Sequence, residues 1–118
     1  MKILSDYAHG ILDYVTVVIF LLAPHLIGFS GLAAIISYSL ATVHLMMSLL
    51  TDMPLGAIKL IPMKLHSYVE LCVAPVLIVG SLFLPATAFN AHWFFAAMGI
   101  VIFVVWLASG YGAVRRAL

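Results

Sequence analysis

The chain has 118 residues, of which 66% are hydrophobic and 8% are charged, and its formal net charge is +1. Its mean hydropathy is +1.27. Soluble domains carry about a quarter charged residues and about half apolar ones, and a sphere of this size cannot hide so much apolar surface from water. The composition therefore excludes a soluble globular protein and predicts one integral membrane domain whose main solvent is lipid.

Four apolar stretches, taken in chain order, predict four transmembrane helices. They cover residues 7–29, 32–51, 62–84 and 92–113. Each stretch is about 20 residues long, which at about 1.5 Å per residue spans a hydrocarbon core of about 30 Å. The predicted fold is an all-α membrane protein whose four transmembrane helices form two related antiparallel hairpins.

The connections between these stretches differ in kind. Residues 29–31, with the sequence Phe-Ser-Gly, predict a minimal turn between the first two helices. Thr51 is a candidate N-cap, and Pro54 is tolerated in a first helical turn, so we expect a short interfacial helix over residues 55–61. Residues 85–90 form an uncharged connection before the fourth helix.

The basic residues predict the orientation in the membrane. All five flank the same ends of the predicted helices: Lys2, Lys59, Lys64, Arg115 and Arg116. The positive-inside rule makes that side cytoplasmic, which places both termini inside and the loops near Gly31 and Thr87 outside. The first apolar run holds a histidine and an aspartate and has no small-residue cleavage pattern, so we expect no cleaved signal peptide. The predicted location is a bacterial inner (cytoplasmic) membrane.

Two of the four acidic residues follow a histidine by four positions inside apolar segments: Asp13 follows His9, and Glu70 follows His66. This spacing places both side chains of a pair on one helix face, and a carboxylate in hydrocarbon is costly enough to require partners. At about 1.5 Å per residue, these residues and His44 fall in one layer near the cytoplasmic helix ends. We expect them to form one polar cluster.

Other polar side chains are expected around this cluster or away from it. Tyr14 and Tyr68 are close enough in sequence to donate hydrogen bonds to the cluster. His25 and His92 fall near the opposite surface, where the neighbouring Trp93 fits an interfacial anchor.

The chemistry of the cluster leaves four interpretations open. Imidazole and carboxylate groups on facing helices are suitable ligands for a transition metal ion, which makes His9, Asp13, His44, His66 and Glu70 candidate metal ligands. The same groups could form ion pairs that only hold the helices together, as in a structural or accessory membrane subunit. Two facing histidines could ligate haem. A buried carboxylate beside the helix-breaking Pro75 could move protons or ions.

Other classes of function find little support. We find no glycine-rich phosphate loop, no nucleophile constellation and no basic patch for nucleic acid, so no catalytic residue is assigned and a non-enzymatic role is favoured. Cys72 is the only cysteine, which rules out a disulfide within the chain. The expected partners are the lipid bilayer and either a second copy or another membrane protein.

Several short runs resemble the small bacterial four-helix membrane proteins of the SPW-repeat group. The resemblance rests on residues 9–14, 51–56 and 61–66 and on a small residue and proline late in a first helix, here Ala23-Pro24-His25 and Ala74-Pro75-Val76. A weak internal repeat accompanies it, because a His and carboxylate pair opens each predicted hairpin. The resemblance implies the fold and no particular activity.

Overall fold

The computed structural model describes residues 4–84 and 89–109 of the chain. This part contains four long helices and no strand: α1 (Asp6–Ala23), which continues into a π-helical turn η1 (Pro24–Gly28), α2 (Gly31–Leu50), α3 (Met63–Ser81) and α4 (Phe89–Ala108). The four apolar spans in these helices are 23, 20, 19 and 19 residues long and could each cross a membrane. The predicted all-α class with four membrane-length helices is confirmed.

Local signals set the beginning and the end of the first helix. The Ser5 side chain accepts a hydrogen bond from the backbone N–H of Ala8, which satisfies one free donor at the start of α1. At the other end, Gly28 has a φ of 87° and Gly31 a φ of 62°. Both values lie in the left-handed region that favours glycine, so these two residues let the chain leave η1 and enter α2 within a few residues.

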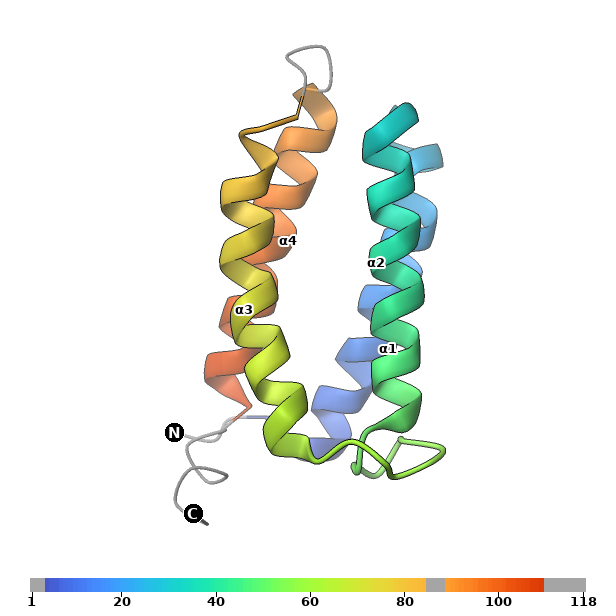
Figure 1. Ribbon diagram of the computed structural model, residues 1–118, viewed down its shortest axis with the longest axis vertical. Coiled ribbons are helices and arrows are strands. Elements are labelled where there is room, and N and C mark those ends of the chain that lie inside the picture. The colour runs from blue at the N-terminus through green and yellow to red at the C-terminus, as the bar shows by residue number, and fades with distance from the viewer. Residues whose placement is uncertain (1–3, 85–88, 110–118) are drawn as a thin grey trace.

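The helices pack mainly in two pairs, with α1 beside α2 and α3 beside α4 (Figure 1). Gly99 of α4 lies so close to α3 that an added Cβ would be 2.7 Å from the carbonyl oxygen of Ala74 and 2.6 Å from Cγ1 of Ile78. Small residues allow membrane helices to approach in this way. The indole N–H of Trp106 also donates to the Ser67 carbonyl, at 3.0 Å.

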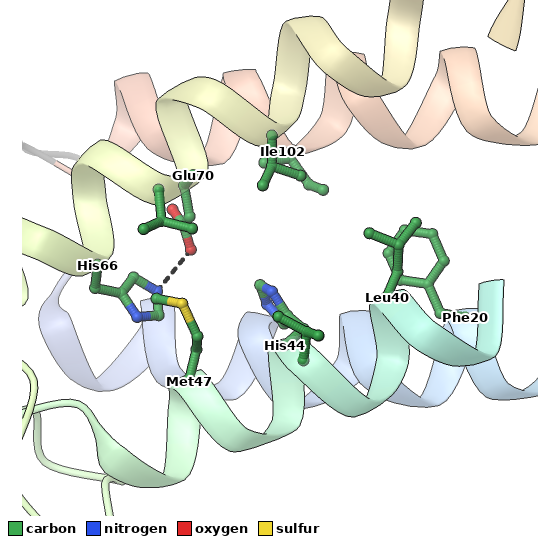
Figure 2. A pocket seen from close by; sticks show the side chains of 10 residues that line it. Phe20, Leu40, His44, Met47, His66, Glu70 and Ile102 are labelled. Atoms are coloured by element: carbon green, nitrogen blue, oxygen red, sulfur yellow. Dashed lines mark hydrogen bonds and ion pairs between the residues drawn. The ribbon is translucent and has the colours of Figure 1, made fainter. Parts of the chain in front are cut away.

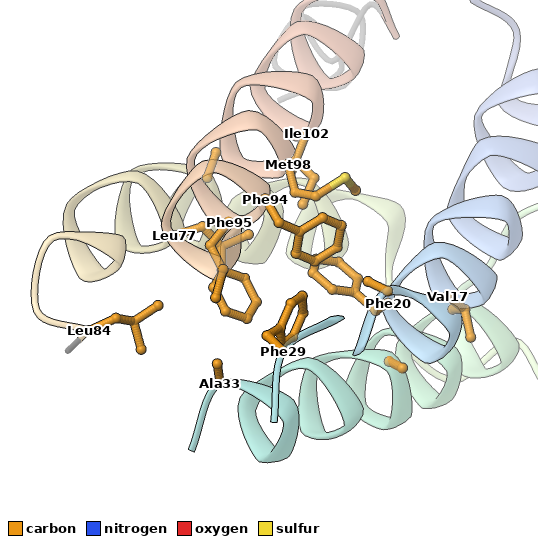
Figure 3. Packing of buried hydrophobic residues seen from close by; sticks show 14 residues of the cluster. Val17, Phe20, Phe29, Ala33, Leu77, Leu84, Phe94, Phe95, Met98 and Ile102 are labelled. Atoms are coloured by element: carbon orange, nitrogen blue, oxygen red, sulfur yellow. The ribbon is translucent and has the colours of Figure 1, made fainter. Parts of the chain in front are cut away.

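Aromatic packing joins the two helix pairs (Figure 3). Phe20 of α1 meets Phe94 of α4 nearly edge to face, with ring centroids 5.5 Å apart. Phe29, which follows η1, contacts both Phe94 and Phe95. This apolar core lies towards the η1 end of α1, whereas His9 and Asp13 lie near its start, so the two helix pairs are joined by apolar contacts at one level and polar contacts at another.

The outer surface of the helices is largely apolar. Ile35 of α2, Val76 of α3 and Val104 of α4 are each more than half exposed, at 63%, 65% and 54%. Exposure of so many apolar side chains to water would be unfavourable for a small protein. The arrangement fits a multi-pass membrane protein with lipid around all four helices.

The predicted interfacial helix over residues 55–61 is wrong, because this segment is irregular. Its N–H groups are used elsewhere: those of Ala57 and Ile58 donate to the Leu49 carbonyl, and those of Leu60 and Ile61 donate to the Leu50 carbonyl. They thereby satisfy acceptors at the C-terminal end of α2, which an ordinary helix end leaves unpaired.

A glycine is essential in this loop. A Cβ added to Gly56 would lie 2.0 Å from the Thr51 carbonyl oxygen. The loop therefore folds tightly onto the end of α2, and it holds Thr51 in a fully buried position.

Candidate metal centre

The first half of the centre comes from α1. His9 and Asp13 lie one helical turn apart on the same face, and both are buried. The distance between Nε2 of His9 and Oδ1 of Asp13 is 3.3 Å. The spacing of four residues that the sequence shows is therefore realised as a contact within one helix.

The second half comes from α3 in the same way. His66 and Glu70 are one turn apart and buried, and Nε2 of His66 is 2.8 Å from Oε1 of Glu70 (Figure 2). The loop before α3 and the first turn of that helix bring His66 to the end of α2.

The two pairs face each other across the helix interface. Nε2 of His9 is 3.1 Å from Oε1 of Glu70, and Nε2 of His66 is 3.2 Å from Oδ2 of Asp13. One ligand atom from each of these four residues lies within 4.8 Å of the others. Each histidine therefore contacts both carboxylates, which is the convergence that the sequence predicted.

His44 of α2 completes the predicted set from the side. Its Nε2 is 3.4 Å from Oδ1 of Asp13, and its side chain is 18% exposed, whereas His9 and His66 are fully buried. Among the described residues, Nε2 of His44 and Oδ2 of Asp13 are buried atoms without a hydrogen-bond partner of good geometry. All five predicted ligands thus come together, with four at the centre and His44 at its edge.

Two hydroxyl groups fix the tautomers of the central histidines. The Thr51 hydroxyl donates its only hydrogen to the Met47 carbonyl, which places its oxygen to accept from Nδ1 of His66, 2.8 Å away. Ser109 repeats this arrangement: its hydroxyl donates to the Val105 carbonyl and lies 2.6 Å from Nδ1 of His9. This arrangement favours a hydrogen on Nδ1 of both histidines, and Nε2 is the atom that faces the carboxylates.

This arrangement has an electrostatic consequence for the neutral imidazoles. With the hydrogen on Nδ1, each Nε2 presents a lone pair, and in His9 and His66 that lone pair points at a carboxylate oxygen of Glu70 about 3 Å away. Such a contact is repulsive unless a positive charge lies between the two groups. Three solutions exist: a metal cation bound by both lone pairs, an additional proton on the imidazoles, or a protonated carboxyl group that donates to a lone pair.

The nitrogen to oxygen separations within the cluster are those of neighbouring ligands in a metal coordination sphere. The nitrogen to oxygen distances among the four central residues lie between 2.8 and 3.3 Å. Ligands bound at about 2.0–2.1 Å are about 3.3 Å apart in a tetrahedron and about 3.0 Å apart in an octahedron. A neutral histidine that binds through Nε2 and donates Nδ1–H to an oxygen is also the usual form of a histidine ligand.

The two tyrosines expected around the cluster do not donate to it. The Tyr14 hydroxyl donates to the Leu55 carbonyl at 2.8 Å, which ties α1 to the loop after α2. The Tyr68 ring lies beneath the ammonium group of Lys64, 5.9 Å from it. Both predictions failed because side-chain direction on a helix depends on the exact residue, and a shift of one position turns a side chain away by about 100°.

Sequence reasoning missed Thr51 and Ser109 as partners of the cluster. Thr51 was interpreted as a helix N-cap, whereas it is the C-cap of α2 and a buried acceptor. Ser109 lies 100 positions from His9 along the chain. The only available signal was a hydroxyl residue at the end of an apolar segment, which is too common to indicate this role.

The remaining predicted features lie elsewhere. Nε2 of His25, in η1, is 3.3 Å from the Tyr38 hydroxyl, at the opposite end of α1 from the cluster, and His92 is in the first turn of α4.

Comparisons with models of protein families, with curated proteins and with solved structures found no match.

Proposed function

We propose that this protein is a multi-pass membrane protein that binds one divalent transition metal ion through His9, Asp13, His66 and Glu70, with His44 beside the ion. The observation that carries the proposal is the pair of hydroxyl acceptors that direct both central Nε2 lone pairs toward the two carboxylates. Two imidazoles and two carboxylates are a familiar ligand set for iron, manganese or zinc.

Charge balance supports a divalent ion. Two carboxylates in a segment surrounded by lipid carry two negative charges, and burial of such charges is costly unless they are compensated. A divalent cation neutralises both. It also provides a partner for Oδ2 of Asp13, whose 3.2 Å contact with Nε2 of His66 does not have hydrogen-bond geometry.

The alternative function is structural, and a specific distance favours it. The 2.8 Å contact between Nε2 of His66 and Oε1 of Glu70 is also the length of a charge-assisted hydrogen bond. Two doubly protonated imidazoles would balance the two carboxylates without a metal. In that case the cluster would be a four-residue ion-pair network that joins α1 to α3 in an accessory membrane subunit.

Haem binding and ion translocation receive less support from the geometry. The rings of His9 and His66 are 5.6 Å apart and nearly edge to face, and both contact the same Glu70 oxygen, which favours a small ion over a flat macrocycle. The described surroundings of the cluster beyond His44 are mostly apolar, which is unsuited to a charged path.

We further infer that the protein lies in a bacterial inner membrane with both termini in the cytoplasm. The basis is the distribution of the five basic residues in the sequence. The four helices then form two antiparallel hairpins, and the metal ion lies near the cytoplasmic ends of the first and third helices. The resemblance to the SPW-repeat group and the relation between the two hairpins are part of this proposal.

Metal analysis of the detergent-purified protein tests the metal function. We expect about one transition metal ion per chain, or per dimer if two copies share a site, and a loss of thermal stability when a chelator removes the ion. His66→Ala and Asp13→Asn should lose the ion. His25→Ala, which changes a histidine far from the cluster, is the matched control and should keep it.

Two results together would contradict the metal function. Substoichiometric metal in the unmodified protein, together with thermal stability that does not change with chelator, would exclude the metal centre and leave the ion-pair network as the function of the cluster.

A further inference from the structure

A small cavity adjoins the metal centre on the side of α2 and α3 (Figure 2). His44, His66 and Glu70 form its polar wall, and its other walls are made by apolar or sulfur-containing side chains, among them Leu40, Val69 and Val73. Its volume is about 40 Å³. A bound water needs about 10–15 Å³ of such space, so the cavity can hold one to a few small molecules and no larger ligand.

The cavity shares an apolar wall with a groove on the outer surface of the helices. A groove of about 330 Å³ runs along the seam between α2 and α3, and it shares Leu40, Val69 and Val73 with the cavity. All three side chains are only partly buried. The groove continues towards Gly80 into a second space of about 210 Å³.

This route selects ligands by size and by polarity. A charged or strongly hydrated molecule would lose its hydration on passing Leu40 and Val73, which costs several kcal/mol or more. A small uncharged molecule that dissolves in hydrocarbon pays no such cost. The volume of the cavity also excludes the head group of a lipid or quinone.

The polar wall of the cavity provides two means of binding a small uncharged molecule, an open position on the metal ion and a hydrogen-bond donor. Four protein ligands leave positions open on an ion that prefers five or six, as non-haem iron(II) does. His44 lines the cavity, and its buried Nε2, 3.4 Å from Oδ1 of Asp13, has no hydrogen-bond partner of good geometry among the described residues. An imidazole in this position can donate a hydrogen bond to a molecule bound at the ion.

We propose that the metal centre takes up a small uncharged diatomic gas, of the class of dioxygen and nitric oxide, which enters from the lipid phase between α2 and α3. This inference rests on the proposed metal function. It adds the class of ligand and the side from which the ligand reaches the ion.

Nitric oxide is the probe, because it binds to iron(II) and gives a characteristic EPR signal. The full-length protein is loaded anaerobically with iron(II) in lipid nanodiscs, the iron content is measured, and nitric oxide is then added. We expect a stoichiometric iron–nitrosyl signal. Azide, a small anion that must come from water, should leave the optical and EPR spectra of the iron protein unchanged.

A cavity-filling variant tests the route. Val73→Phe should keep its iron and slow nitric oxide binding by about tenfold or more, because a phenyl ring fills the space that the cavity and the groove share. Val79→Phe is the matched control. It makes the same change on the same helix at a residue that is 53% exposed and lines neither space, and it should bind nitric oxide at the rate of the unmodified protein.

The outcomes separate this inference from the function on which it rests. Failure to bind iron(II) overturns the gas inference, and failure to bind any divalent transition metal ion overturns the metal function as well. Full iron occupancy without a nitrosyl signal, or with azide binding as readily as nitric oxide, overturns only the gas inference. Equal rates in Val73→Phe and Val79→Phe, with nitric oxide bound in both, would exclude the route between α2 and α3.

Discussion

Thr51 accepts a hydrogen bond from Nδ1 of His66 at 2.8 Å, because its own hydroxyl hydrogen is donated to the Met47 carbonyl. A residue at the end of α2 thus decides which nitrogen of a histidine on α3 faces the carboxylates. Ser109, after α4, has the same relationship with His9 on α1. The orientation of the two central imidazoles therefore depends on these two hydroxyls.

The first prediction concerns the effect of Thr51 on the orientation of His66. Thr51→Val keeps the shape of the side chain and removes the acceptor, so His66 loses the partner that fixes its tautomer and orientation. We expect metal affinity to fall by about 10- to 100-fold, the usual cost of losing such a partner. Thr51→Ser retains the hydroxyl and should retain most of the affinity. Titration against a competing chelator measures both, and equal affinities for the two variants would contradict the role.

The second prediction is the sign of the pH dependence. A metal ion requires neutral imidazole and ionised carboxylate, so occupancy and thermal stability should fall together as the pH falls. A network of imidazolium and carboxylate groups has the opposite pH dependence. Its thermal stability should fall as the pH rises, because the imidazolium groups lose their protons and with them their positive charges. Thermal unfolding across pH, with and without chelator, distinguishes the two. Stability that declines only towards high pH would favour the ion-pair network.

The third prediction concerns coupling between the carboxylates. Asp13 and Glu70 contact the same two histidines. Asp13→Asn and Glu70→Gln should therefore each lower the free energy of unfolding, and their combined effect should depart from additivity by about 0.5–3 kcal/mol. Reversible unfolding in mixed micelles measures this. The pair Asp13→Asn with Asp52→Asn is the control and should be additive, and additivity in both pairs would mean that the carboxylates do not share partners.

The fourth prediction tests the contact between α3 and α4. Gly99→Ala places a methyl group against the Ala74 carbonyl, which is backbone and cannot move aside cheaply. We expect a loss of about 1–3 kcal/mol in the free energy of unfolding. Gly80→Ala has no atom within 4 Å of the new Cβ, and it should change stability by less than about 1 kcal/mol, in the stabilising direction. Equal effects of the two substitutions would argue against close packing at Gly99.

The fifth prediction concerns topology. Because the five basic residues flank the same helix ends in the sequence, reporter fusions at residue 118 and near Lys59 should indicate the cytoplasm, and a fusion near Thr87 the periplasm. A periplasmic reporter at residue 118 would overturn the proposed orientation.

The sequence by itself was sufficient for the four helices and for the pairing of residues within each helix. Bilayer thickness sets the length of an apolar span, so hydropathy located all four helices without knowledge of their packing. Helical periodicity placed His9 beside Asp13 and His66 beside Glu70, because contacts four residues apart need only the geometry of one helix.

Tertiary structure alone decided how these pairs combine. The 3.1 Å contact of His9 with Glu70 joins residues 61 positions apart, and it depends on the rotation of α1 against α3, which neither helix specifies alone. The segment over residues 55–61 does not form the predicted helix, because its N–H groups donate to carbonyl groups at the end of α2. No local sequence pattern reveals these acceptors. The same loop buries Thr51, and the packing of α4 brings Ser109 to His9. The tautomers of the two central histidines are therefore a property of the assembled helices.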